Sequence, residues 1–377
     1  MVVIVCFLST HYSARPSIQA QPDTPESRMW MMVQAQKLQI DQLDQKINNL
    51  QAQLSKYSMP VSIRKQVQRD TSEGKQIPQP VLTKKQLQLF ESYNKIPVKL
   101  YVNNLRDRTW TLRPELCQNL TGFQSAKLHT VSGVMDVYIH DPKDDKWVSG
   151  SLANGHVWES GLVNLVLTSL KKGKHTTFID IGANLGIYSL FAAKNGFKVI
   201  SIEPLKINVQ RMCSSLRAGH LTDKVTIVRG ALSDVSQNVS LGIDVNNVGG
   251  SFVLQDRNKN KVKDSKVGGQ YSDIVMSTTL DNILQLPGLN LTRAVIKMDV
   301  EGYEHKVVRG GTEFFDSVII PTVLMEWAFH KGADSGTEII HFFETRNYTA
   351  YDPLTNIYLH SKSSNTWPPE IIWRKKV

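Results

Sequence analysis

A carboxylate beside a glycine-rich turn is the feature of this sequence best suited to holding a cofactor. Asp180 interrupts the apolar segment 177–181, and the turn that follows, 182–186, contains two glycines and an asparagine. Glycines let the backbone approach a ligand closely, and a helix that starts after such a turn presents free N–H groups. Glu203 ends the next apolar segment, where its carboxylate is placed to accept the hydroxyls of a ribose.

The spacing of these residues favours S-adenosylmethionine over a dinucleotide. A dinucleotide site is expected to show G-x-G-x-x-G at its first turn, and a Walker site G-K-S/T, but this turn reads D-x-G-x-N-x-G. The charge of Asp180 repels a pyrophosphate, whereas it suits the cationic amino group of S-adenosylmethionine, which has a ribose and no phosphate. The competing interpretation is that Glu203 only caps the helix that follows it.

A second group of ionisable residues lies at the end of a later apolar segment, 294–299. Lys297 and Asp299 share one face of this predicted strand, and Glu301 follows at the edge where open α/β sheets bind ligands. His305 lies one turn into the next predicted helix. Methyl transfer needs an aligned acceptor and, for a hydroxyl, removal of a proton. We therefore expect Asp299 beside the methyl group, with Glu301 or His305 as the base.

Structural interpretations of the same residues stay open. Glu301 is also suited to capping the N-terminus of its helix, and His305 to being a surface histidine without a catalytic role. Lys297 is able to form a structural ion pair with Asp299 or with Glu326, at the end of the next strand. Clustered carboxylates also suit a divalent cation, but without a histidine pair this signal is weak, so no metal ligand is predicted.

These residues are expected to lie on alternating strands and helices. Such alternation predicts an α/β fold with a parallel, doubly wound sheet, and two final strands without a helix between them predict an antiparallel edge. The predicted strands are 177–181, 198–202, 225–229, 294–299, 319–327, 349–358 and 371–374. The predicted helices are 158–170, 186–194, 206–218, 280–286, 304–315 and 337–345.

The chain before this region has a different character. Residues 1–27 begin with an apolar run too short to cross a bilayer and are expected to be a signal or anchor remnant with a linker. Apolar residues repeat every seven positions in 28–57, which predicts a coiled-coil stem that forms a homodimer, or else a single amphipathic helix. A linker is expected at 58–82, a small β-rich lead-in at 83–157 and the main domain at 158–377.

Charge and cysteine content restrict the function only slightly. The net charge of +10 suits an anionic partner or a membrane surface, but the basic residues are scattered, so a solvated basic surface is the simpler interpretation. The three cysteines, Cys6, Cys117 and Cys213, have no C-x-x-C spacing. Neither a disulfide framework nor a zinc site is therefore predicted, and Cys213 is expected to be a small buried apolar residue.

Several blocks between Trp158 and Trp327 resemble the FkbM-type family of S-adenosylmethionine-dependent methyltransferases. The blocks are 158–159 (WE), 178–193 (FIDIGANLGIYSLFAA), 202–204 (IEP), 231–234 (ALSD), 247–251 (NVGGS), 279–281 (TLD), 296–311 (IKMDVEGYEHKVVRGG) and 324–326 (LME). The block at 296–311 is the most specific of them. Residues before about 150 carry no such resemblance.

The resemblance implies a fold and a set of cofactor contacts. The fold it implies is the seven-stranded methyltransferase sheet with strand order 3-2-1-4-5-7-6. It implies that the turn cradles the amino acid part of S-adenosylmethionine and that Glu203 holds the ribose. It also places Ser233 and Asp234 where the adenine edge is read. The turn residues concerned are Asp180, Gly182, Ala183, Asn184 and Gly186.

The expected function is therefore S-adenosylmethionine-dependent O-methylation, with a sugar hydroxyl of a glycoconjugate or a small molecule as the acceptor. The rival expectation is a non-catalytic binding or trafficking protein that kept the fold. Nucleic-acid methylation ranks low because strand 294–299 is followed by V-E-G, with no N-P-P-Y-like tetrad. Membrane anchoring in the endomembrane system or Golgi lumen is expected, with the cytoplasm as the alternative. Four N-x-S/T sequons support secretion weakly, and they start at Asn119, Asn238, Asn290 and Asn347.

Overall fold

The computed structural model describes residues 97–244, 247–253 and 273–376. The predicted N-terminal remnant, stem and linker, together with the start of the lead-in, lie outside the described residues. The chain divides into two compact units, and all described residues belong to the second, Pro78–Val377.

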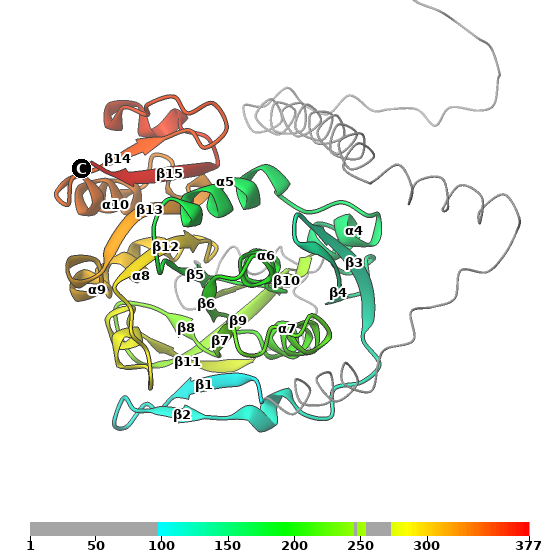
Figure 1. The fold of residues 1–377 in the computed structure, drawn as a ribbon. Helices are drawn as coiled ribbons and strands as arrows, with labels where there is room; N and C mark the ends of the chain where they lie inside the picture. Colours follow the sequence, from blue (N-terminus) through cyan, green and yellow to red (C-terminus); the bar gives the residue numbers. More distant parts are fainter. Residues whose placement is uncertain (1–96, 245–246, 254–272, 377) are drawn as a thin grey trace, which may run out of the picture. The chain divides into compact units, whose positions relative to one another are not determined.

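Nine strands of the described residues form one mixed sheet, in the order β14-β15-β13-β12-β5-β6-β7-β1-β2 (Figure 1). Its strands are β1 (Lys99–Asn103), β2 (Trp110–Leu112), β5 (Thr177–Ile181), β6 (Lys198–Ile202), β7 (Val225–Val228), β12 (Arg293–Met298), β13 (Ile319–Glu326), β14 (Tyr348–Tyr351) and β15 (Glu370–Lys375). The strands β7, β6, β5, β12 and β13 run parallel, whereas β15 is antiparallel to both β13 and β14. The predicted parallel sheet with an antiparallel edge is confirmed.

The expected strand count needs correction. From β7 to β14 the order is the expected 3-2-1-4-5-7-6, but β1 pairs in parallel with β7, and β2 then pairs with β1. These two strands come from the predicted lead-in, so part of that segment belongs to the main sheet. The alternation of apolar residues in 98–102 predicts a strand but does not say which sheet edge the strand joins.

The central strands are buried on both faces. In β5 the side chain of Phe178 packs with the core on one face, whereas Ile179 and Ile181 pack with the core on the other. The first core contains α5 (Ser160–Lys171), α6 (Ile187–Lys194) and α7 (Lys206–Ala218), and the second contains α8 (Glu304–Arg309), α9 (Thr312–Ser317) and α10 (Asp334–Glu344). Figure 1 shows these two sets of helices on opposite sides of the sheet.

The predicted helix 304–315 is two helices, because a pair of glycines separates α8 from α9. A side chain on Gly310 would put its Cβ 2.2 Å from the carbonyl oxygen of Ser233, and one on Gly311 would meet Leu280 at 2.8 Å. The chain therefore breaks its helix where neighbouring segments approach closely. Leu280 precedes the 3-10 helix η3 (Asp281–Gln285), which lies within the predicted helix 280–286.

The described residues also form a four-stranded sheet and a two-stranded hairpin. The four-stranded sheet has the order β10-β9-β11-β8. Its strands are β8 (Ala231–Leu232), β9 (Asn238–Asp244), β10 (Asn247–Val253) and β11 (Ile274–Thr278), and the hairpin is β3 (Gln124–Thr130) with β4 (Gly133–Ile139). The hairpin packs on α7, where the amide of Tyr138 donates to the Ser215 hydroxyl at 2.9 Å. The remaining short helices are α4 (Val148–Ala153), η1 (Pro114–Cys117), η4 (Ala328–His330) and η5 (Ser361–Thr366).

A disulfide joins Cys117 at the end of η1 to Cys213 on α7. The prediction that the cysteines form no disulfide is therefore wrong for this pair. The two residues are 96 positions apart, and local spacing carries no information on a pairing that the packing of η1 against α7 brings about. Within the described ranges, no helix is both long and apolar enough to cross a membrane.

Candidate active site

A pocket opens at the carboxyl ends of β5, β6 and β12, the edge at which the sequence predicted binding. The space between its walls, counted together with its open mouth, is about 620 Å³. The walls come from the turn after β5, the end of β6, strand β8, the β9–β10 hairpin and the segment after β12. Predicted site residues on the walls are Gly182, Asn184, Glu203, Asp299 and Glu301.

The turn after β5 is held against both neighbouring strands. The amides of Gly182 and Ala183 both donate to the carbonyl of Ile202 on β6, at 3.0 Å. Gly182 has a φ of +76°, and a Cβ there would lie 1.7 Å from the carbonyl oxygen of Asp299. Only glycine allows this turn to pass so close to the end of β12. The turn thus brings the cofactor-type residues and the Asp299 segment to one pocket.

Asp180 lies behind the pocket wall and not on it. Its side chain is fully buried, and Oδ2 accepts hydrogen bonds from the amide and the hydroxyl of Ser189 on α6, at 3.1 and 2.7 Å. Burial raises the pKa of this carboxyl, while Lys297 and Ser189 act in the opposite direction. These contacts tie β5 to the first turn of α6, and Oδ1 has no hydrogen-bond partner in the described part of the chain. Direct contact of Asp180 with a cofactor stays a prediction.

Glu203 organises the pocket from the end of β6. Its Oε2 accepts from the amide of Asn184 at 2.7 Å, and its Oε1 accepts from the amide of Leu205 at 2.9 Å and from Asn208 Nδ2 at 3.2 Å. Burial raises the pKa of Glu203 to about 7, against the lowering effect of these hydrogen bonds. A buried carboxylate that lines the pocket and titrates near neutrality is typical of a functional site.

A buried lysine pairs with Asp299, which lines the pocket. Lys297 Nζ lies 3.1 Å from Asp299 Oδ2 and donates to the carbonyl of Gly182 at 2.8 Å. Burial alone would lower the pKa of Lys297, but the charges of Asp299, Asp180 and Glu159 more than offset it and raise the pKa above its usual value. The lysine is therefore cationic, and its contact with the Asp299 carboxylate is the predicted ion pair.

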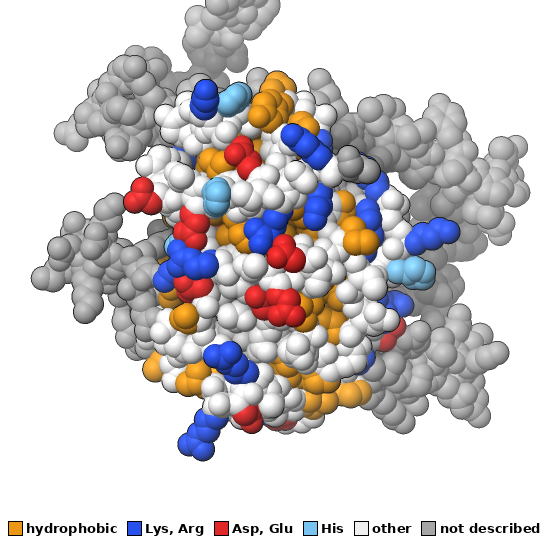
Figure 2. All heavy atoms as spheres, turned by 90° about the vertical axis from the view of Figure 1, so that its left-hand side faces the viewer, with side chains coloured by type: hydrophobic (Ala, Val, Ile, Leu, Met, Phe, Trp, Pro, Cys, Tyr) orange, Lys and Arg blue, Asp and Glu red, His pale blue; other side chains and the backbone are white. Residues whose placement is uncertain are grey.

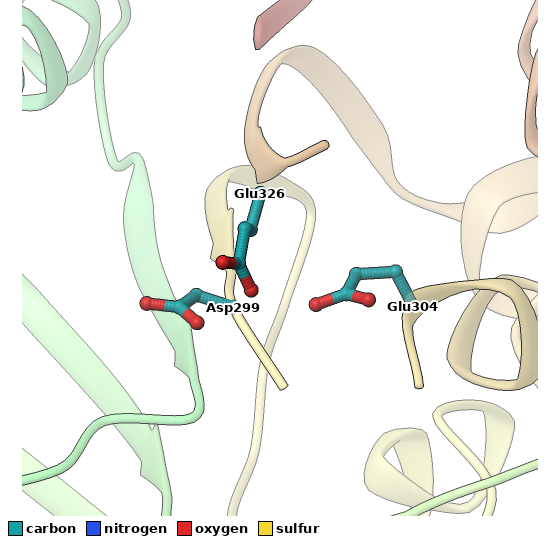
Figure 3. Close-up of side chains that lie close together, drawn as sticks. All are labelled: Asp299, Glu304 and Glu326. Atoms are coloured by element: carbon teal, nitrogen blue, oxygen red, sulfur yellow. The ribbon is translucent and has the colours of Figure 1, made fainter. Parts of the chain in front are cut away.

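Two further carboxylates face Asp299. Asp299, Glu304 and Glu326 each have an oxygen within 4.8 Å of the others, and Figure 3 shows them converging from the segment after β12, the start of α8 and the end of β13. Glu304 is fully occupied, since Oε1 accepts from the Val300 amide and Oε2 bonds His330 Nε2, both at 2.7 Å. Burial and the surrounding carboxylates raise the pKa of Glu326 to about 12, so this group is protonated at neutral pH.

The two predicted bases differ in position. Glu301 lines the pocket, in a left-handed backbone conformation with φ of +57°. His305 does not line it, and its ring makes edge-to-face contacts with Tyr303 and His330. The Nδ1 atom of His305 is buried and has no hydrogen-bond partner among the described residues. Burial and the neighbouring His330 lower the pKa of His305. Of the two, Glu301 is the better placed to reach an acceptor.

The two residues expected at the adenine edge lie outside the pocket lining. Ser233 donates to Asp234 Oδ1 at 3.0 Å, and Asp234 Oδ2 pairs with Arg309 Nη1 at 2.7 Å. Arg309 also pairs with Glu338 at 2.7 Å, so Asp234 belongs to an ion-pair network between the β8 region, α8 and α10. Leu232, two residues before Asp234, does line the pocket.

Residues 180–350 match the family model of the methyltransferase FkbM domain. This region belongs to the FkbM methyltransferase family. The match spans the glycine turn, Glu203 and Asp299, and it confirms the resemblance that the sequence blocks indicated. No curated protein matches the chain.

Solved structures similar to this chain include other methyltransferases. One is an rRNA methylase from Streptococcus thermophilus (11% identity, 57% of this chain and 93% of that chain covered, TM-score 0.32). Another is a putative O-methyltransferase from Klebsiella pneumoniae (11% identity, 63% of this chain and 92% of that chain covered, TM-score 0.33). A third is the Pyrococcus abyssi tRNA (uracil-54, C5)-methyltransferase in complex with S-adenosyl-L-homocysteine (10% identity, 67% of this chain and 44% of that chain covered, TM-score 0.34). At this level of similarity, neither the substrates nor the ligand of those proteins transfer to this chain.

Several pocket residues of the FkbM domain were not predicted. They are Tyr303 and the apolar side chains of the β9–β10 hairpin, among them Leu241 and Phe252, which also line the pocket. The buried Glu304–His330 pair and the Tyr188 hydroxyl, which donates to Glu159 at 2.8 Å, were also missed. Two of these features lie in blocks that resemble the family: Glu159 in WE at 158–159, and part of the hairpin in NVGGS at 247–251. Residue spacing alone did not indicate what either block does.

Proposed function

We propose that the FkbM domain binds S-adenosylmethionine and methylates a hydroxyl oxygen on the sugar of a glycoconjugate. One observation carries this proposal: carboxylates of two strands, Glu203 on the β6 side and Asp299 on the β12 side, line one pocket around a glycine turn. The first is suited to ribose hydroxyls and the second to an acceptor hydroxyl.

The residues on the wall fit this cofactor. Glu203 offers a carboxylate at the end of β6, and Asn184 has a buried side-chain oxygen without a partner among the described residues. The acidic lining, with Asp299 and Glu301, suits a cationic ligand and opposes a pyrophosphate. S-adenosylmethionine supplies a methyl group already activated on a sulfonium, so the chain has mainly to align the acceptor and remove its proton.

Asp299 is placed to accept the proton that an acceptor hydroxyl loses. It is about one-third exposed, it borders the pocket, and it pairs with Lys297 at 3.1 Å. Glu326 does not line the pocket, but an oxygen of its protonated carboxyl lies within 4.8 Å of Asp299. Glu301 is the second candidate for the base because it also faces the pocket.

We expect cofactor affinity to rise with pH through about 7 because ribose hydroxyls need the ionised form of Glu203. Calorimetry between pH 5.5 and 8.5 should show affinity falling about tenfold per unit below that value and levelling off above it. The Glu203→Gln protein should bind weakly with a flat profile.

The stability of the unliganded protein should respond to pH with the opposite sign. The unfolded chain loses the Glu203 proton near 4.5, whereas the folded chain keeps it until about 7, so this group's contribution to stability falls as pH rises between these values. A wild-type affinity that does not change with pH would contradict the role of Glu203.

A nucleic-acid acceptor is less well supported. Acidic and basic side chains are mixed on the face that Figure 2 shows, without one continuous basic area. A nucleic-acid surface is expected to concentrate Lys and Arg on one face or stripe. A sugar acceptor instead needs only a pocket with hydrogen-bonding groups, such as the one beside Asp299.

Calorimetry with S-adenosylmethionine and with NAD on the full chain tests the cofactor part of this proposal. We expect heat with the former only, and no heat at high protein concentration would overturn the enzyme proposal. Incubation with methyl-labelled cofactor and cell extract, followed by separation of glycan, lipid and small-molecule fractions, tests the acceptor. Label in the glycan fraction is expected. Binding without transfer to any fraction would favour a non-catalytic binding protein.

Turnover is expected to be insensitive to chelation of divalent cations. Although Asp299, Glu304 and Glu326 converge, both oxygens of Glu304 are hydrogen-bonded, and Glu326 retains a proton. Methyl transfer should therefore proceed equally after treatment with EDTA and after addition of Mg²⁺. A loss with EDTA that Mg²⁺ restores would instead assign a cation to this cluster.

The cellular setting belongs to the same proposal. We propose that the protein works in the endomembrane or Golgi lumen, where glycoconjugate acceptors are found, with an N-terminal membrane anchor. The heptad segment 28–57 would join two copies as a homodimer. Sedimentation of the full chain beside a truncation that begins at Pro78 tests the dimer, which only the full chain should form.

A further inference from the structure

We propose that Asn119 and Asn290 carry N-linked glycans and that the domain folds in an oxidising secretory compartment. The proposal rests on the luminal location proposed above but not on the methyl-transfer chemistry. Two independent observations carry it, the buried disulfide and the exposure of two sequons.

The disulfide is the first observation. Cys117 and Cys213 are both fully buried and joined to each other, which fixes η1, in the middle of the lead-in, on the long helix α7. Structural disulfides persist in secreted proteins and in the lumen of the secretory pathway and are rare in the reducing cytosol. Forming this bond removes a proton from each thiol and transfers two electrons to the disulfide of a thiol oxidoreductase, which is reduced to its dithiol.

The exposure of the sequons is the second observation. In Asn119-Leu120-Thr121 both the asparagine and the threonine are exposed, in irregular chain after η1, two residues beyond the disulfide. In Asn290-Leu291-Thr292 both are again exposed, in the loop between η3 and β12. The leucine at the centre of each sequon packs against a core, so each segment is held in place while its polar residues face outward.

The other two sequons are built differently. Asn238 begins β9 and pairs with Met276 on β11, which places its sequon within a sheet. Asn347 is exposed, but Thr349 of its sequon is only 8% exposed, on β14. A glycan is bulky and needs an open surface, so the two loop sequons are the better acceptors.

The modification itself is a group transfer. The Nδ2 atom of the asparagine forms a bond to the anomeric carbon of a lipid-linked oligosaccharide and loses one proton. The bond between that carbon and the lipid diphosphate breaks, and the lipid diphosphate leaves. Neither Asn119 nor Asn290 lines the pocket, so a glycan on either residue leaves the pocket walls unchanged.

Expression of the full 377-residue chain in insect cells tests the proposal. Peptide-N-glycosidase should increase the gel mobility of the wild-type protein by two steps, and peptides cleaved without reduction should contain linked Cys117 and Cys213. Asn119→Gln and Asn290→Gln should each remove one step. Thr121→Ala should remove the same step as Asn119→Gln, whereas Thr121→Ser should keep it, because only the latter preserves the sequon.

Two results would overturn the proposal. Unmodified Asn119 and Asn290 in a protein with the disulfide formed would show that the sites are wrong. Free thiols at both cysteines would show that the compartment is wrong. Calorimetry with S-adenosylmethionine on the same samples separates this test from the proposed function, since all the variants should bind the cofactor as the wild type does.

Discussion

The Gly182→Ala protein is expected to lose measurable binding of S-adenosylmethionine and much of its stability. An alanine Cβ would lie 1.7 Å from the carbonyl oxygen and 2.9 Å from the carbonyl carbon of Asp299, and neither backbone atom is free to rotate away. The φ of +76° adds the cost of a left-handed conformation. We expect a loss of roughly 3–5 kcal/mol in the free energy of unfolding, measured by urea denaturation, because the turn must separate from β12.

Gly196→Ala is the matched control for this variant. Gly196 also has a positive φ, +91°, but a Cβ there would meet no atom within 4 Å. This variant should therefore show only the backbone cost of about 1–2 kcal/mol and should bind the cofactor normally. Equal losses in the two proteins would show that backbone strain, and not contact between the turn and the end of β12, accounts for the Gly182 effect.

Asp299→Asn is expected to lower kcat by about 10²- to 10⁴-fold while changing the Kd for the cofactor only a few-fold. Asparagine has the same shape but does not accept a proton at neutral pH, and proton removal by a positioned base contributes an effect of this size. The buried Lys297 also loses its ion-pair partner at 3.1 Å, so a lower Tm should accompany the change. Steady-state kinetics with the identified acceptor, together with calorimetry, separate the two effects.

Two comparisons determine which residue is the base. Asp316→Asn removes an exposed carboxylate on α9 that pairs with Arg346 and does not line the pocket, and it should leave kcat unchanged. Glu301→Gln and His305→Ala test the two bases that the sequence predicted. A near-normal kcat in Asp299→Asn beside a hundredfold loss in either of these proteins would assign the proton transfer elsewhere.

The elements around the site were predictable because their sequence signals are local. The strands at 177–181 and 198–202 and the helix at 206–218 have the predicted bounds in the structure. Each is a short apolar or amphipathic segment with a break at its end, so periodicity and turn residues are sufficient. The rule that parallel strands bind ligands at their carboxyl ends then placed Glu203 and Asp299 at one edge.

The roles of individual side chains depend on contacts between distant segments, which local patterns do not contain. The sequence predicts contact of Asp180 with a cofactor, and this stays a prediction. What the sequence did not predict is that Asp180 is fully buried and that its Oδ2 accepts two hydrogen bonds from Ser189 on α6. Glu326 reads as an ordinary acid, but burial and its carboxylate neighbours raise its pKa to about 12.

The same distinction applies to the chain as a whole. The sequence by itself determined the order of the main-sheet strands from residue 177 onward, the methyltransferase family, and the glycine turn with its two flanking carboxylates, because these depend on residue type and spacing. Only the tertiary structure decided that Cys117 pairs with Cys213, that β1 and β2 extend the sheet, and that the β9–β10 hairpin forms a pocket wall. Each of these joins segments far apart in the chain, and their burial and pairing energies appear only when the segments meet.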